Sequence, residues 1–149
     1  MDEDFKQLEE LVMADMRETY AEEVIDHFLN PRNLGEIQSP DGFARVTGPC
    51  GDTMEIRLRV RNDAVYNATF WTDGCGPSIA CGSMTTELVK GKSIGEALGI
   101  TQEDILSSLG GLPEESQHCA LLASNTLKAA LRDYLALKNE PWKRAYRSI

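Results

Sequence analysis

The sequence predicts an α+β protein, with a three-stranded antiparallel sheet early in the chain, helices packed on it and a long C-terminal helix. Two observations indicate this order. Apolar and polar residues alternate with period two between residues 42 and 71, as in half-buried strands. From residue 78 onward, apolar residues recur at helical spacing instead. The chain has 149 residues, 42% of them hydrophobic, which is enough for one compact core.

Two short helices are expected before the sheet. The first covers residues 5–16, where the preceding acidic residues suit the positive end of a helix dipole. The second begins near Tyr20 and stops before Asn30, because the proline that follows disfavours helical backbone at the residue preceding it. His27 lies on this second helix. We interpret it as a structural histidine, since nothing near it suggests a metal partner.

The three strands are expected over residues 42–48, 52–61 and 64–71, with a hairpin turn at Asn62-Asp63. The second strand places Met54, Ile56 and Leu58 on one face, and a charged outer face is predicted opposite them. Helices are then expected over residues 78–90, 93–98, 102–109 and 114–138. The chain thus divides into an N-terminal helical extension (residues 1–19), a main domain (20–138) and a basic aromatic tail (139–149).

Charge and composition exclude some classes of function. A net charge of −9 and a pI near 4.7 argue against nucleic-acid binding, which requires a basic surface. No apolar run reaches the roughly 18–20 residues that cross a bilayer, so no membrane role and a cytoplasmic location are expected. In that compartment four cysteines are reduced, metal-bound or catalytic more often than they are structural disulfides.

Three of the four cysteines stand in segments that suit a metal or sulfur site. Cys75 lies between two glycines just before a predicted helix, where the helix dipole favours a thiolate. Cys50 follows Gly48-Pro49, and in an extended segment it shares a side with Asp52. The alternative is that Cys50 is a small buried apolar residue and Asp52 caps a turn.

The third segment is His118-Cys119, near the start of the last helix. Adjacent helical side chains diverge by about 100°, so the two are not expected to grip one metal symmetrically. Cys119 is the expected constant ligand and His118 an alternate ligand or proton carrier. Cys81, in contrast, falls on an apolar helical stripe and is predicted to be an inert buried thiol. Three thiolates suit zinc, Cu(I) or an iron–sulfur cluster, and the residues alone do not separate these.

Taken together, these landmarks resemble the IscU/NifU-like family of iron–sulfur cluster assembly scaffolds. The resemblance rests on segments whose order and spacing match: Tyr20-Ala-Glu-Glu-Val-Ile-Asp-His-Phe28, Asn30-Pro-Arg-Asn33, Gly48-Pro-Cys-Gly-Asp52, Gly74-Cys-Gly-Pro-Ser-Ile-Ala80, Val89-Lys-Gly-Lys-Ser93 and His118-Cys119. It implies that Cys50, Cys75 and Cys119 hold a [2Fe–2S] cluster. It further implies that Asp52 ligates the cluster or tunes its lability, and that His118 is the alternative fourth ligand.

The resemblance also implies a non-enzymatic mechanism and its partners. A cysteine desulfurase would pass persulfide sulfur to Cys119, iron would join it, and the cluster would move to recipient apo-proteins. Zinc in the resting form is a further expectation. The acidic segment before Tyr20 and the basic aromatic tail after Lys138 are additions to the family pattern, and a homodimer or contacts with a partner are expected of them. The loop Leu112-Pro-Glu-Glu-Ser116 departs from the Leu-Pro-Pro-Val-Lys that a dedicated chaperone reads, so recognition by that chaperone is not expected.

Two other functions fit parts of the pattern. One is a zinc-bound persulfide acceptor, like the SufU branch of the family, although that branch usually has an insertion between its second and third cysteines that is absent here. The other is a structural zinc module, which would unfold when its metal is removed. The sizeable apolar core argues against such dependence on metal.

Overall fold

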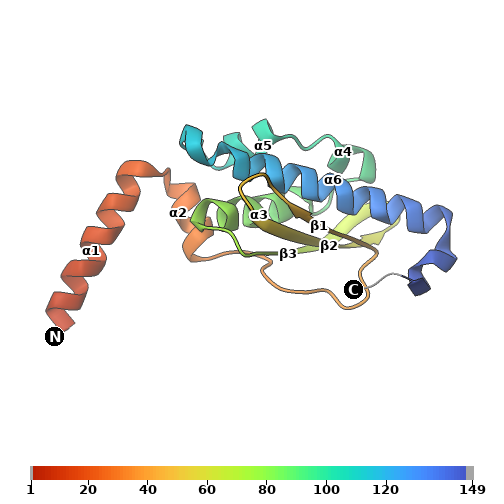
Figure 1. The fold of residues 1–149 in the computed structure, drawn as a ribbon, viewed down its shortest axis with the longest axis horizontal. Helices are drawn as coiled ribbons and strands as arrows, with labels where there is room; N and C mark the ends of the chain where they lie inside the picture. The colour runs from red at the N-terminus through yellow and green to blue at the C-terminus, as the bar shows by residue number, and fades with distance from the viewer. Residues whose placement is uncertain (1, 147–149) are drawn as a thin grey trace.

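The structure, a computed structural model, describes residues 2–146. It confirms the predicted α+β architecture, with three antiparallel strands in the order β1-β2-β3. These strands are β1 (Gly42–Thr47), β2 (Thr53–Arg61) and β3 (Ala64–Thr72). Helices α3 (Gly76–Val89) and α6 (Gln117–Asn139) pack over one face of the sheet, as Figure 1 shows.

The core lies between that face of the sheet and the two helices. Met54, Ile56 and Leu58 of β2 are fully buried there, as their alternation in the sequence predicted. α3 approaches β3 closely because Gly82 has no side chain. A Cβ at this position would lie 2.4 Å from the ring of Phe70, so the core depends on glycine here.

The outer face of the sheet differs in one respect from the sequence prediction. Glu55 is only 6% exposed, although it lies on the face expected to be solvated. Arg45 pairs directly across from it on β1 and donates from Nε to Oε2 at 2.7 Å, while Arg57 Nη1 donates to Oε1 at 2.9 Å. The two long arginine side chains thus cover the carboxylate, which the alternation pattern alone does not reveal.

The predicted hairpin turn at Asn62-Asp63 is confirmed. Both residues have positive φ, 54° and 57°, as a two-residue turn with the twist of the sheet requires. The Asp63 carboxylate also accepts hydrogen bonds from the Tyr134 hydroxyl and from Lys138 Nζ, each at 2.8 Å. The turn therefore ties the sheet to the far end of α6.

The remaining helices flank this layer, except the N-terminal helix, which projects away from it (Figure 1). They are α1 (Asp2–Thr19), α2 (Glu22–Leu29), α4 (Ile94–Leu98), α5 (Gln102–Ser108) and the 3-10 turns η1 (Glu114–Ser116) and η2 (Pro141–Tyr146). α1 extends beyond the predicted residues 5–16, because its apolar pattern ends before its helical backbone does. The predicted helix over 114–138 divides into η1 and α6. No helix within residues 2–146 is long and apolar enough to cross a membrane.

Candidate metal centre

The turn between β1 and β2 presents Cys50 and Asp52. It is closed by hydrogen bonds from Gly48 N to Asp52 O at 2.8 Å and from Gly51 N to Gly48 O at 3.0 Å. Gly51 has φ +88°, a conformation that side chains rarely allow, so glycine permits this tight turn. Cys50 is exposed and Asp52 is partly buried. The turn thus offers a soft and a hard donor from one loop.

The turn between β3 and α3 presents Cys75. This residue is the N-cap of α3 and Pro77 stands in the first turn, as the sequence predicted, and the thiol is exposed. Gly74 lets this turn pack against the neighbouring one. A Cβ there would lie 2.5 Å from Ser78 Oγ and 3.2 Å from Asp52 Oδ2, so any side chain would push the two loops apart.

The first turn of α6 presents His118 and Cys119. Ligand atoms of Asp52, His118 and Cys119 all lie within 4.8 Å of one another, which is the spacing of a group that could hold one metal ion. Cys119 Sγ is 3.7 Å from His118 Nε2. The two side chains thus lie close together although they are adjacent on the helix, and whether they bind one metal together stays a prediction.

Ser78 is a member of this site that the sequence analysis missed. Its hydroxyl is fully buried and lies 3.3 Å from Cys119 Sγ, 3.4 Å from Asp52 Oδ2 and 3.9 Å from Cys75 Sγ. One hydroxyl thus joins groups from all three segments. A signal did exist in the sequence, because a residue three positions after Cys75 on a helix faces the same side as Cys75.

Burial dominates the electrostatics of Cys119. Cys119 is only 1% exposed, and this burial raises the pKa of its thiol to about 11. The Ser78 hydrogen bond acts in the opposite direction, while the nearby Cys75 and Asp52 raise the pKa further. Without metal, the Cys119 thiol is therefore neutral at physiological pH, and metal binding must release its proton.

Cys50 completes the open side of the site. It lies outside the tight group and lines a cavity of about 190 Å³ together with Asp52, His118 and Leu122. The structure thus brings Asp52, His118 and Cys119 close together and links Cys75 to them through Ser78. Cys50 lies outside this group but lines the same cavity as Asp52 and His118.

The two residues predicted to be structural are buried and lie outside the group of candidate ligands. Cys81 is fully buried in the apolar core, where burial, and after it the nearby Cys119 and Cys75, raise the pKa of its thiol well above the ordinary value. His27 Nδ1 lies 2.7 Å from Ser83 Oγ, a partner that joins α2 to α3. Burial, the largest influence, lowers the pKa of His27, so this imidazole is neutral at physiological pH.

Comparison with known proteins identifies the family. The sequence profile of the NifU-like N terminal domain matches residues 19–141. The chain belongs to this family. Among its relatives, the iron-sulfur cluster assembly scaffold protein IscU 1 of Archaeoglobus fulgidus is 46% identical over 116 residues, which are 77% of this chain and 76% of the relative.

Two other NifU-like relatives are similar to the same extent. The iron-sulfur cluster assembly scaffold protein IscU of Aquifex aeolicus is 47% identical over 78% of this chain and 76% of its own length. The IscU of Escherichia coli is 44% identical over 77% of this chain and 93% of its own.

A solved structure supports the fold. The crystal structure assigned to an iron-sulfur cluster assembly scaffold protein of the SUF system from Fervidobacterium islandicum superposes with a TM-score of 0.61 at 22% identity. The match covers 75% of this chain and 96% of that one.

Proposed function

We propose that this NifU-like protein is a scaffold on which a [2Fe–2S] cluster assembles before it passes to recipient apo-proteins. The observation that carries the proposal is the convergence of Asp52, His118 and Cys119 within 4.8 Å, with Cys75 joined to them through Ser78. Relatives 44–47% identical over about three quarters of the chain bear the name of such scaffolds. A scaffold holds its cluster as cargo and is not an enzyme in the ordinary sense.

The donor atoms fit this cargo. Thiolates of Cys50, Cys75 and Cys119 are the ligands that iron–sulfur clusters take in proteins. Cys119 lies in the group with Asp52 and His118, Cys50 lines a cavity with those two residues, and Cys75 is linked to Cys119 through the Ser78 hydroxyl. The fourth position belongs to Asp52 or His118. A carboxylate oxygen is a harder ligand than a thiolate, so a cluster held partly by Asp52 is bound less firmly than one held by four cysteines. Weak binding suits a cluster that must leave.

Sulfur reaches the site by thiol exchange in this proposal. The Cys119 thiolate attacks the outer sulfur of a persulfide on a cysteine desulfurase, a new S–S bond forms on Cys119, and the desulfurase cysteine leaves as a thiolate. Because burial raises the pKa of Cys119 to about 11, the attack requires help with its proton. His118 Nε2 lies 3.7 Å from the sulfur and is placed to accept the proton. The Ser78 hydroxyl donates a hydrogen bond to the sulfur and so stabilises the thiolate. Electrons from an external donor then reduce the sulfur to sulfide.

The decisive experiment is anoxic purification followed by an absorption spectrum, with iron, acid-labile sulfide and zinc quantified. The same measurements are repeated after reconstitution with a cysteine desulfurase, cysteine and iron. Equal iron and sulfide with visible charge-transfer bands, lost in Cys50→Ser, Cys75→Ser and Cys119→Ser but kept in Cys81→Ser, is the expected result. Tightly held zinc, with no cluster even after reconstitution, would instead assign the site to a zinc-bound sulfur acceptor.

A further inference from the structure

The N-terminal helix α1 has an apolar side that the rest of the chain does not cover. Phe5, Leu8 and Val12 are 64%, 58% and 49% exposed, and α1 projects away from the body in Figure 1. Most of α1 precedes residue 19, where the match to the family profile begins. Met16 of α1 lines a cavity beside Cys75, but α1 supplies none of the candidate ligands. An isolated helix of 18 residues is at best marginally stable in water.

A groove runs between this side of α1 and the end of α2. It has a volume of about 720 Å³ and its apolar lining residues are Phe5, Leu8, Val12, Met13, Met16, Phe28 and Leu29. Leu11 is also 65% exposed on α1 but does not line the groove. The groove is large enough for several side chains, and large exposed apolar surfaces of this kind mark interaction sites.

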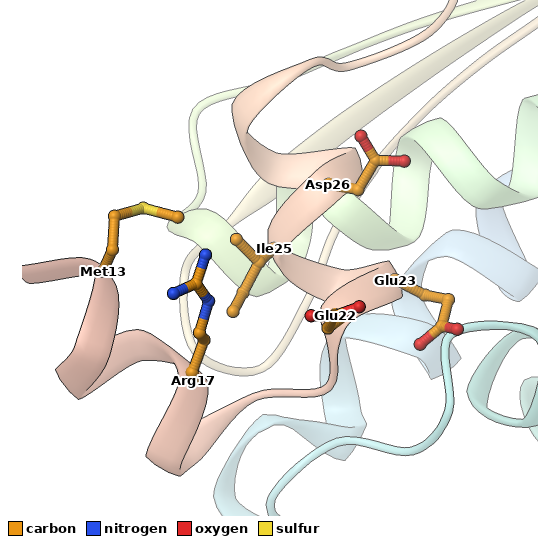
Figure 2. Close-up of a pocket in the computed structure, with 6 residues that line it drawn as sticks. All are labelled: Met13, Arg17, Glu22, Glu23, Ile25 and Asp26. Atoms are coloured by element: carbon orange, nitrogen blue, oxygen red, sulfur yellow. The ribbon is translucent and has the colours of Figure 1, made fainter. Parts of the chain in front are cut away.

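Acidic residues outnumber basic ones around the groove, although the charged residues that line it are balanced, with Lys6 and Arg17 against Glu9 and Glu10. In α1 the acidic residues far outnumber Lys6 and Arg17. Figure 2 shows the end of α1 facing α2, where Arg17 of α1 and Glu22, Glu23 and Asp26 of α2 line a pocket. Asp26 is already paired with Arg32 at 2.7 Å, so Glu22 and Glu23 carry the negative charge there. An occupant that combines apolar side chains with positive charge therefore fits this end of the molecule best.

The C-terminal tail of the chain has that combination. Trp142 in η2 is 60% exposed, and Lys143 Nζ lies 6.0 Å from the centre of its ring. Basic residues outnumber the one acidic residue, Glu140, between residues 138 and 149. Lys143 pairs with Glu140, but such an exposed ion pair is worth at most about 1 kcal/mol and exchanges readily.

The tail and the groove cannot meet within one chain. Figure 1 shows α1 at one end of the long axis of the molecule and η2 at the other, with the sheet and α6 between them. A contact between them must therefore join two copies. When two elongated molecules lie side by side in opposite directions, the tail of each one reaches the groove of the other. Both tails and both grooves are then occupied, so the dimer is closed.

We propose that the tail around Trp142 of each copy docks in the α1–α2 groove of a second copy, so that two reciprocal contacts hold a homodimer. The indole fills the groove lined by Leu8 and Phe28, and the basic residues of the tail face the acidic surface of α1 and α2. The proposal concerns the two segments at the ends of the fold and does not depend on the cluster.

The test is the oligomeric state of the full chain, measured by sedimentation equilibrium over a range of protein concentrations. The wild-type chain is expected to form dimers that weaken as salt is added. Trp142→Ala and Leu8→Gln each weaken the dimer at least about tenfold, because an aromatic anchor and its pocket carry much of the binding energy. Leu11→Gln, on the same helix and as exposed, and Trp71→Ala, an exposed aromatic on β3, leave it unchanged.

Mixing the two variants identifies the occupant. A Trp142→Ala copy keeps an intact groove and a Leu8→Gln copy keeps an intact tail, so the mixture regains one contact and forms heterodimers that neither variant forms alone. A chain that stays monomeric at all concentrations would overturn the proposal. So would a dimer that Leu8→Gln breaks and Trp142→Ala does not, because α1 would then pair with α1 of the second copy.

Discussion

The buried hydroxyl of Ser78 lies 3.3 Å from Cys119 Sγ and 3.4 Å from Asp52 Oδ2. A hydroxyl has one proton to donate, so it serves either the thiolate or the carboxylate at a given moment. In the metal-free protein this single group therefore links the protonation of Cys119 to the position of Asp52. The pairing also holds two loops together before any metal arrives.

Removal of this hydroxyl should make Cys119 less reactive. In Ser78→Ala the thiolate loses a hydrogen bond worth about 1.5 kcal/mol, so the pKa of Cys119 rises and its alkylation near neutral pH slows about tenfold. Iodoacetamide labelling of the metal-free protein, resolved by peptide mass spectrometry, measures this rate. Ser124→Ala removes another buried serine hydroxyl, which bonds to Ile100 O, and should leave the rate unchanged. Equal labelling of Cys119 in Ser78→Ala and wild type would contradict the role of Ser78.

The raised pKa of Cys119 also predicts how stability depends on pH. The folded metal-free protein holds this proton up to about pH 11, whereas an unperturbed thiol loses it near 9.0. The free energy of unfolding is therefore unaffected below pH 9.0 and falls by about 3 kcal/mol as the pH rises through that window.

Urea unfolding at a series of alkaline pH values measures this fall. Cys119→Ala should flatten the decline in part, because Cys81 has a pKa shifted in the same direction and still contributes. Identical slopes in the variant and the wild type would show that Cys119 does not titrate in this way.

Gly74 is predicted to be indispensable for the approach of the loops. A methyl group in Gly74→Ala would meet Ser78 Cβ at 2.6 Å, so the backbone must shift, at a cost of about 1–3 kcal/mol in unfolding free energy. Gly95→Ala is the matched control, since nothing lies within 4 Å of that Cβ and Gly95 is in helix α4. The control should be neutral or stabilising by up to about 1 kcal/mol. Thermal unfolding of both variants measures these changes in stability. Equal changes in Gly74→Ala and Gly95→Ala would argue against crowding at Gly74.

If the scaffold function is right, Asp52→Ala should prolong the life of the bound cluster. The substitution removes the hard oxygen ligand, and the site is left with thiolates and His118. We expect the visible absorption of the reconstituted protein to decay more slowly in oxygen or with a chelator. Asp73→Ala changes a carboxylate that binds Thr53 N instead, and serves as control. An unchanged or shorter lifetime in Asp52→Ala would remove Asp52 from this role.

Cys81→Ser tests whether the buried fourth thiol is only part of the core. The amount of reconstituted cluster should stay near the wild-type level, because Cys81 is fully enclosed by apolar residues. The melting temperature should fall by a few degrees, since a hydroxyl replaces a thiol in an apolar site at a cost of about 1–2 kcal/mol. Loss of the cluster with an unchanged melting temperature would make Cys81 a ligand.

Local sequence patterns were enough to predict the strands, the helices and the chemistry of the candidate ligands. Alternation along residues 53–61, the Asn62-Asp63 turn and the helix start at Cys75 depend on neighbours within a few positions, so local patterns predict them. Cys50, Cys75 and Cys119 were also identified there, because their glycine-rich or histidine-paired settings are local.

Only the tertiary structure decided which of these groups meet. Asp52 and Cys119 are far apart in the chain, and they come together because β2 packs under α6. The packing of α3 against α6 makes Ser78 a partner of both, and the pairing of β1 with β2 lets two arginines cover Glu55 on the opposite face of the sheet. Such contacts depend on how far apart two elements lie in space. The spacing of apolar residues along the sequence does not give that distance.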